Sequence, residues 1–304
     1  MTARPAAAKT AFGPMVIAAC EQILPADQRL FDDPDAVRLL PSSQRLIVRA
    51  CRWKPVHHLL VRATDSKAHD LWASVLCRKR YADDKVRDAL HDGIKQFAFL
   101  GAGLDTRPYR LVAPAGARSF ETDLQANIAY KRRRLAEAYG RPPANTTLTA
   151  VDLETDDLTV ALSAAGFDWT EPAMFVWEAV TQYLTEDGVR RTLACLTPSA
   201  PGSRLIFTYV RRDFLDGTED YGAAPARHEF VTKRHVWHFG LLPEETPALL
   251  RDYGWTEREQ VGPTEYAERY LGPLGRDLTV SPIERFVYAD RSTDEPAGRA
   301  DADR

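Results

Sequence analysis

The middle of the chain alternates between short, nearly continuous apolar runs and longer amphipathic stretches. Apolar runs of about four to eight residues are typical of strands that are covered on both faces. Alternation of such strands with helices predicts a doubly wound α/β domain built on a parallel sheet. The predicted strands are 97–100, 118–123, 148–152, 173–178 and 204–209, with a last strand at 284–289.

Two helices of this region have recognisable ends. Thr185 is placed to cap a helix with an acidic first turn, and Pro198 stops that helix. A second helix is predicted to start at Pro243 and to end at Gly254. The rest of the stretch 211–260 has the polar, Gly- and Ala-containing composition of a loop.

The two ends of the chain differ from this α/β pattern. Residues 1–92 show helical patterns without alternating strands, which predicts a helical lid or cap that packs on a larger body. Residues 93–290 form the predicted α/β domain. The tail 291–304 is charged and lacks an apolar face, so we predict that it is disordered.

The N-terminal stretch that ends at Cys20 superficially resembles an export signal, because two cations precede it. Gly13 and Pro14 interrupt its apolar run, and Glu21 follows directly. Val16 and Cys20 lie on one helical face, so we predict a buried helix, with export as a minor alternative. No apolar run approaches membrane-spanning length, so no membrane is predicted as a partner.

The composition narrows the range of partners. The 304 residues include 40 basic and 43 acidic side chains and carry a net charge of −3. This balance argues against nucleic acid or an anionic membrane as an obligatory partner. The four cysteines are remote from one another and form no C-x-x-C pair, so neither a metal site nor a disulfide framework is predicted, and a reducing cytoplasm fits.

Acidic side chains fall at the carboxyl ends of three predicted strands. These are Asp123, Asp152 and Glu178, whereas the first strand ends in Gly101 and Gly103. Ligands of open α/β sheets bind beyond the carboxyl ends of the strands, so we expect these residues to meet at one crevice. The glycines let the backbone approach a ligand without an intervening Cβ.

The spacing of these residues restricts the ligand. Asp123 lies 20 residues after Gly103, which is typical of an acid that accepts hydrogen bonds from ribose hydroxyls. Asp152 can accept from an adenine amino group. The run 101–106 lacks the third glycine of G-x-G-x-x-G, and Asp105 would repel a pyrophosphate. A cationic ligand without phosphate suits this rim better, with a nucleotide-dependent oxidoreductase as the alternative.

Several segments share motifs with one enzyme family. They are the specific block from Phe99 to Arg107, and 78–84, 109–111, 120–123, Lys131, 151–153 and 178–185. Over residues 30–290 the chain resembles the leucine carboxyl methyltransferase-like family of class I S-adenosylmethionine (SAM) methyltransferases. The resemblance implies a Rossmann-like, mostly parallel seven-stranded sheet and SAM as the cofactor. The chain departs from the family pattern at two positions. Thr122 lies in the usually hydrophobic segment of the second strand, and Glu178-Ala179 stands where the family usually has Glu-Gly.

The resemblance also implies roles for individual residues. Arg78 would pair with the carboxylate of the methionine moiety, because a guanidinium matches a carboxylate bidentately. Asp123 would bind the ribose, Asp152 the adenine edge and Glu178 the region of the amino group. The full set of implied cofactor-binding residues is Arg78, Gly101, Ala102, Gly103, Asp123, Leu124, Asp152, Leu153 and Glu178.

Each of these residues also has a purely structural interpretation. The two glycines could make a tight turn, and Asp123 and Asp152 could be helix N-caps. Arg78 could belong to a solvated helix face, as could the basic run 131–134. An N-cap role would explain Asp123 or Asp152 taken alone, but it does not explain why glycines and acids recur together at the carboxyl ends of the strands.

The sequence indicates less about the group that accepts the methyl than about the cofactor that supplies it. A carboxylate is ionised at neutral pH and needs no general base, whereas a phenol, with a pKa near 10, would be helped by a base such as histidine. The run 270–289 looks most like the carboxyl methyltransferases of aromatic polyketide (tetracenomycin-type) pathways. We therefore expect methyl esterification of a small aromatic acid.

Alternatives to this acceptor stay open. They are a phenol, a protein C-terminal carboxylate, or SAM binding without methylation, and the sequence predicts no oligomeric state. The candidate catalytic residues are Tyr183, Tyr209, Arg211 and His228, with Arg212 nearby and with Trp177, Trp237 and Phe239 as candidate walls for an aromatic acceptor.

Overall fold

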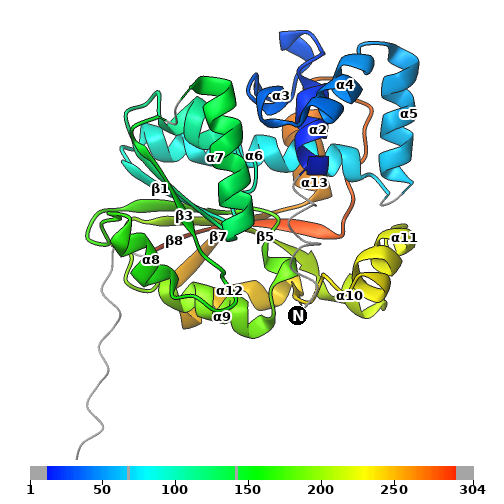
Figure 1. Cartoon of the computed structure of the whole chain (residues 1–304). Helices are drawn as coiled ribbons and strands as arrows, with labels where there is room; N and C mark the ends of the chain where they lie inside the picture. Colours follow the sequence, from blue (N-terminus) through cyan, green and yellow to red (C-terminus); the bar gives the residue numbers. More distant parts are fainter. Residues whose placement is uncertain (1–11, 67–68, 141–142, 292–304) are drawn as a thin grey trace, which may run out of the picture.

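The computed structural model describes residues 12–66, 69–140 and 143–291. These residues form one twisted eight-stranded sheet with helices on both faces (Figure 1). Its strands are β1 (Gln96–Leu100), β2 (Arg118–Asp123), β3 (Thr146–Ala150), β4 (Ala173–Trp177), β5 (Arg204–Arg211), β6 (Gly240–Leu241), β7 (Trp255–Val261) and β8 (Glu284–Arg291).

The order of the strands confirms the predicted doubly wound, mostly parallel sheet. Seven strands follow the order β3-β2-β1-β4-β5-β8-β7, and the short β6 pairs with β5. The strands from β1 to β6 pair in parallel, and β8 runs antiparallel to both β5 and β7. The chain reverses its direction of winding between β1 and β4, which is where ligands of such sheets bind. Every residue of β1 and β4 is buried, as the continuous apolar runs predicted.

Several details differ from the sequence prediction. Beside the seven strands expected, the two-residue β6 forms an eighth. The stretch interpreted as a loop after β5 contains short helices at Arg212–Asp216, Ala224–Arg227 and His228–Lys233. The third strand ends at Ala150, so Asp152 lies in the following loop. Strand β7 was missed, although its buried residues at the two ends and exposed residues between them resemble an edge strand. Arg291 is the last residue of β8 and not the start of a tail, while the rest of the predicted tail lies outside the described residues.

The helices of the α/β domain cover both faces of the sheet. Thr185 caps α9 as predicted, because its side chain accepts a hydrogen bond from the N–H of Gly188. The helix predicted from Pro243 begins as a 3₁₀ turn and ends before Gly254. These helices and turns are α6 (Leu71–His91), η3 (Pro108–Val112), α7 (Gln125–Tyr139), α8 (Leu158–Ala164), η4 (Thr181–Tyr183), α9 (Glu186–Cys195), η6 (Pro243–Glu245) and α12 (Thr246–Asp252).

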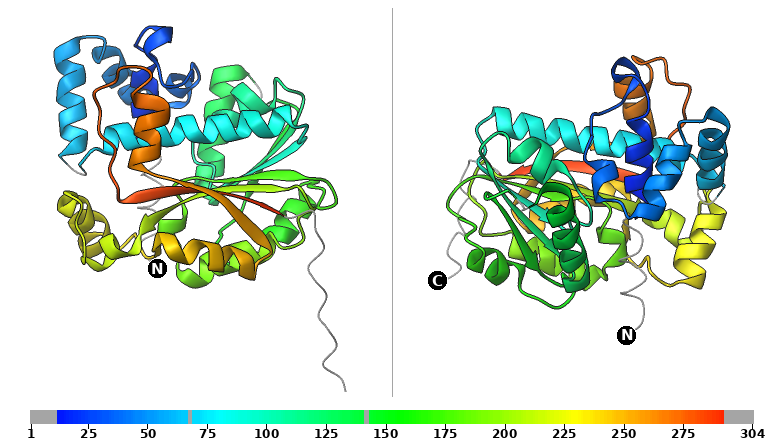
Figure 2. Two further views of the ribbon diagram at one scale, coloured as in Figure 1. Left: turned by 180° about the vertical axis from the view of Figure 1, so that it is seen from behind. Right: turned by 45° about the horizontal axis from the view of Figure 1, so that its top comes forward.

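Short helices gather around one end of this body. The N-terminal ones lie beside the segment that precedes β8 (Figure 2), and Arg276 of that segment pairs with Glu21 at 2.8 Å. Their bounds are α2 (Phe12–Glu21), η2 (Ala26–Gln28), α3 (Ala36–Leu39), α4 (Ser42–Ala50) and α5 (Lys54–Asp65), followed later by α10 (Arg212–Asp216), α11 (Ala224–Arg227), η5 (His228–Lys233), α13 (Pro263–Tyr266) and η7 (Ala267–Leu271).

Helix α2 joins the main hydrophobic core. Met15 and Cys20 are buried in one cluster with Leu76 of α6 and Phe99 of β1. The helix ends at Glu21, so the predicted buried helix is real but shorter than the apolar pattern suggested. In the described part of the chain, we find no helix with the length and apolar character needed to span a bilayer.

Candidate active site

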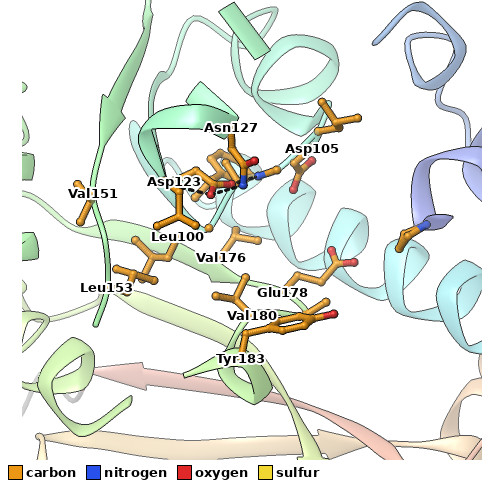
Figure 3. A pocket seen from close by; sticks show the side chains of 18 of the residues that line it. Leu100, Asp105, Asp123, Asn127, Val151, Leu153, Val176, Glu178, Val180 and Tyr183 are labelled. Atoms are coloured by element: carbon orange, nitrogen blue, oxygen red, sulfur yellow. Dashed lines mark hydrogen bonds between the residues drawn. The ribbon is translucent and has the colours of Figure 1, made fainter. Parts of the chain in front are cut away.

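A cavity of about 220 Å³ lies beyond the carboxyl ends of β1, β2 and β4. Figure 3 shows its lining side chains converging from separate elements. Tyr183 lines this cavity, and so does every residue predicted to bind the cofactor. These residues are Arg78, Gly101, Ala102, Gly103, Asp123, Leu124, Asp152, Leu153 and Glu178.

The glycine turn after β1 forms the floor of the cavity. Gly101 and Gly103 have φ values of +66° and +45°, which L side chains rarely adopt. A Cβ at Gly101 would lie 2.6 Å from Cγ2 of Val180. The N–H of Gly103 donates to Oδ2 of Asp123 at 2.6 Å, which ties the turn to the end of β2. The turn therefore needs both the backbone freedom and the small size of glycine.

The carboxylate of Asp123 is held in a fixed orientation. Its Oδ1 accepts hydrogen bonds from the N–H of Leu124 and from Nδ2 of Asn127, each at 2.7 Å. Burial raises the pKa of Asp123, and the donors on Asn127, Gly103 and Leu124 oppose that rise. Asn127 was missed by the sequence analysis, although its position four residues after Asp123, on the first turn of α7, was a usable signal.

Buried ion pairs form one end of the cavity. Nε of Arg78 contacts Oε1 of Glu178 at 2.8 Å, and its Nη1 contacts Oε1 of Glu284 at 2.9 Å. Arg107 holds the other oxygen of Glu178 at 2.7 Å. Burial alone would raise the pKa of Glu178, but Arg107, Lys79 and Arg78 hold that pKa below its usual value. Arg78 thus lies where the sequence placed it, but its guanidinium already has two carboxylate partners within the chain.

A second layer of ion pairs supports this end. Arg107 also contacts Asp83 at 2.7 Å and Asp105 at 2.6 Å, and Arg110 contacts Asp83 at 2.5 Å. Arg107 is 1% exposed and Asp83 is fully buried. Within the motif block from Phe99 to Arg107, Asp105 and Arg107 therefore form an internal ion pair, and Asp105 also lines the cavity.

The opposite end of the cavity is more apolar. Figure 3 shows Val151 and Leu153 at one end and Asp105 and Glu178 at the other. Asp152 accepts a hydrogen bond from the N–H of Glu154 at 3.1 Å, which is a turn contact. The cavity therefore has an apolar end, with Asp152 and Glu154 beside it, and a strongly charged end.

The four candidate catalytic residues do not lie together. Tyr183 lines the cavity, whereas Tyr209, Arg211 and His228 are not among its lining residues. Tyr209 is fully buried and donates its hydroxyl to Gln260 at 2.9 Å, and burial raises its pKa to about 12.

Arg211 and His228 are placed by elements outside the cavity. Arg211 pairs with Asp213 at 2.5 Å, and His228 is the first residue of η5. The apolar lining instead includes Pro14 and Met15 of α2, which no sequence motif indicated.

Ala179 occupies a position at which the family that the sequence resembles usually has glycine. Its φ is +59°, in the left-handed region that favours glycine, and its N–H donates to Oγ1 of Thr208 at 2.8 Å. The strained backbone is thus held in place by β5, and it follows Glu178 directly.

Replacement of Ala179 by glycine is expected to raise the free energy of unfolding by about 0.5–1 kcal/mol, because it removes left-handed strain. Chemical denaturation would measure this gain. Ala165→Gly is the matched control: Ala165 has φ −80°, so glycine there is expected to destabilise the protein. Equal losses for both variants would contradict the strain at Ala179.

The fold and this cavity define a class I SAM-dependent methyltransferase: a glycine turn after β1, an acid at the end of β2, and a site where the sheet reverses its winding. Two solved structures agree in fold. A provisionally named methyltransferase from Thermobifida fusca has a TM-score of 0.59 at 20% identity, over 84% of this chain and 92% of that one. A DUF574 family protein from Streptomyces avermitilis has a TM-score of 0.56 at 15% identity, over 76% and 88%.

Sequence comparison identifies the family. A provisionally named SAM-dependent methyltransferase of Parafrankia sp. is 33% identical over 73% of this chain and 70% of its own length. A relative of the same description from Mycolicibacterium paratuberculosis is 37% identical over 60% of this chain and 61% of its own length. The family profile described as leucine carboxyl methyltransferase matches residues 11–197, and the chain belongs to this family. It is a SAM-dependent methyltransferase, which sets the oxidoreductase alternative aside.

Proposed function

We propose that the chain transfers the methyl group of SAM to the carboxylate of a small aromatic acid, of the kind made by polyketide pathways, and so forms a methyl ester. The proposal rests on the kinds of side chain that line the cavity. Among the described residues that line it there is no histidine, and Tyr183 offers a hydroxyl group. A carboxylate needs no base, whereas a phenol would be helped by one. The family description, which names a carboxyl group as the acceptor, supports the same choice.

The residues of the cavity fit SAM. Asp123, held by three donors from the chain, would accept from the ribose hydroxyls, and Asp152 from the adenine amino group. Val151 and Leu153 would contact the adenine ring, and Glu178 would face the ammonium. When bound, SAM supplies an electrophilic methyl group on its sulfonium.

The chain's own contribution to methyl transfer is orientation and exclusion of water. Pro14 and Met15 bring α2 to the cavity wall, which supports the proposal that the N-terminal helices act as a lid. The hydroxyl of Tyr183 would orient the acceptor carboxylate while leaving its second oxygen free to attack. The four cysteines are unpaired thiols, which fits the reducing cytoplasm we propose as the location.

The proposal is tested with SAM labelled in its methyl group and matched pairs of aromatic acids and phenols. We expect labelled product from the acids, and release of the label as methanol in mild base, since esters hydrolyse and aryl ethers do not. The rate should change little between about pH 6 and pH 9, because the acceptor stays ionised throughout. A peptide that ends in leucine separates a small-molecule acceptor from a protein one.

Other outcomes have definite meanings. A base-stable product, with a rate that rises toward the pKa of a phenol, would replace the carboxylate by a phenol as acceptor. Binding of SAM without product across the panel would favour a SAM-binding protein with another activity. Tyr183→Phe is expected to raise KM for the acceptor and to leave the affinity for SAM unchanged.

A further inference from the structure

Helices α4 and α5 turn large apolar side chains toward solvent. Leu46 is 66% exposed, and Trp53 and Leu59 are each 68% exposed. Together with Ile47 they are four of the five large apolar side chains that are exposed in the described part of the chain, and the fifth, Val160, lies on α8. A single exposed apolar residue is ordinary, but a group confined to two consecutive helices indicates a surface for another molecule.

The two helices bury little of their own surface. In α4 only Val48 is buried, whereas Leu46 and Ile47 face outward. No residue of α5 is fully buried, although Val56 and Leu60 pack partly against the main core. Figure 1 shows both helices at the outer margin of the molecule. The apolar side of α4 is therefore directed away from the core, which is the reverse of an ordinary surface helix.

The charge of this surface has one sign. The stretch 36–64 contains six cations and no acidic residue, in a chain whose net charge is −3. Four of these cations are exposed, and no carboxylate of the described residues forms an ion pair with them: Arg49, Arg52, Lys54 and Arg62. The overall composition averages out this local excess. It argues against an anionic membrane as an obligatory partner, but it does not oppose a reversible contact at one surface.

An anionic lipid surface matches this combination of side chains. Cations beside exposed Leu, Ile and Trp side chains are typical of helices that lie in the membrane interface, where the apolar groups enter the acyl boundary and the cations meet phosphate. Trp53 directly precedes α5, and indole rings favour the level of the lipid headgroups. A second copy of the chain fits less well, because two such faces would bring like charges together. An acidic protein would need complementary packing for four projecting side chains, whereas lipids adapt to them.

We propose that α4 and α5 form a reversible docking surface for an anionic phospholipid bilayer. The apolar part of this surface is Leu46, Ile47, Trp53 and Leu59, and the four exposed cations flank it. Val48 of α4 is buried in the same core cluster as Met15 of α2, which lines the cavity, so the docking helices are packed onto the wall of the active site. The docking is independent of the acceptor in the proposed function.

The test measures binding of the full chain to sedimented vesicles. One set contains phosphatidylglycerol and phosphatidylcholine, and the other contains phosphatidylcholine alone. We expect binding to the anionic vesicles to be at least roughly tenfold tighter and to weaken as salt is added, because salt screens exposed cations. Trp53→Ser is expected to weaken this binding by roughly tenfold, since it removes the largest apolar group. Arg52→Gln should weaken it by about fivefold.

Two substitutions outside the surface are the matched controls. Val160→Ser removes an exposed apolar side chain of α8, and Arg190→Gln removes an exposed cation of α9. Both should leave vesicle binding unchanged, and all four variants should bind S-adenosylhomocysteine as the unsubstituted chain does, which shows that they are folded.

Three results would overturn the proposal. Equal binding to neutral and anionic vesicles would remove the role of the cations. Absence of binding to both kinds of vesicle would leave an acidic protein as the partner of this surface. A dimer in solution that Trp53→Ser dissociates would assign the surface to a second copy of the chain.

Discussion

Replacement of Asp123 by alanine is expected to lower the affinity for S-adenosylhomocysteine by at least roughly 100-fold, which corresponds to about 3 kcal/mol. The variant would lose a charged acceptor for the ribose hydroxyls. It would also leave the N–H of Gly103, now bonded at 2.6 Å, without its partner on β2. Both losses act on the same ligand, since the glycine turn and the carboxylate line one cavity.

Calorimetric titration of the folded variant measures this loss. Asn127→Ala is the graded control, because it removes one donor at 2.7 Å from Asp123 and leaves the carboxylate in place. Its expected effect is about tenfold or less. An Asp123→Ala variant that is folded and binds the ligand as tightly as the unsubstituted chain would show that Asp123 is only a structural anchor for the turn.

Replacement of Asp83 by alanine is expected to lower the free energy of unfolding by about 3–5 kcal/mol. Asp83 is fully buried between Arg107 and Arg110, so its loss leaves two buried guanidinium groups undercompensated. Arg107 in turn holds Glu178 in the cavity wall. We therefore expect weaker SAM binding to accompany the lost stability.

Chemical denaturation at neutral pH would measure this effect, with Asp84→Ala as the neighbouring control. Asp84 pairs with the partly exposed Arg80 at 2.9 Å, and pairs of that kind contribute about 1 kcal/mol or less. Equal losses for the two variants would contradict the importance of the buried network.

The same site predicts a pH dependence. Burial alone would raise the pKa of Asp83, but Arg110 and Arg107 outweigh it and hold the pKa below the usual value near 4. A carboxyl whose pKa is lower in the folded state stabilises the protein above its unfolded pKa, and this stabilisation is lost as the pH falls. The difference in stability between Asp83→Ala and the unsubstituted chain should therefore shrink below about pH 4. A difference that grows on acidification would contradict this assignment.

The sequence by itself determined the framework of the protein. Continuous apolar runs identify strands of a covered parallel sheet, because burial on both faces leaves no polar alternation. All six predicted strands begin within two residues of an observed strand: β1, β2, β3, β4, β5 and β8. The glycine turn and the acids after these strands identified the cavity, since the carboxyl ends of parallel strands meet at one edge. These features depend on local spacing, which a sequence displays directly.

Only the tertiary structure decided which charged groups are already paired. Arg78 contacts Glu178, 100 residues away, and Glu284, 206 residues away. Local periodicity does not report such contacts, so the sequence could not show that the chain itself already engages Arg78. The same reason placed Tyr209 against Gln260 and away from the cavity. A residue type shows what a side chain can do, but only the folded chain shows which partner it has.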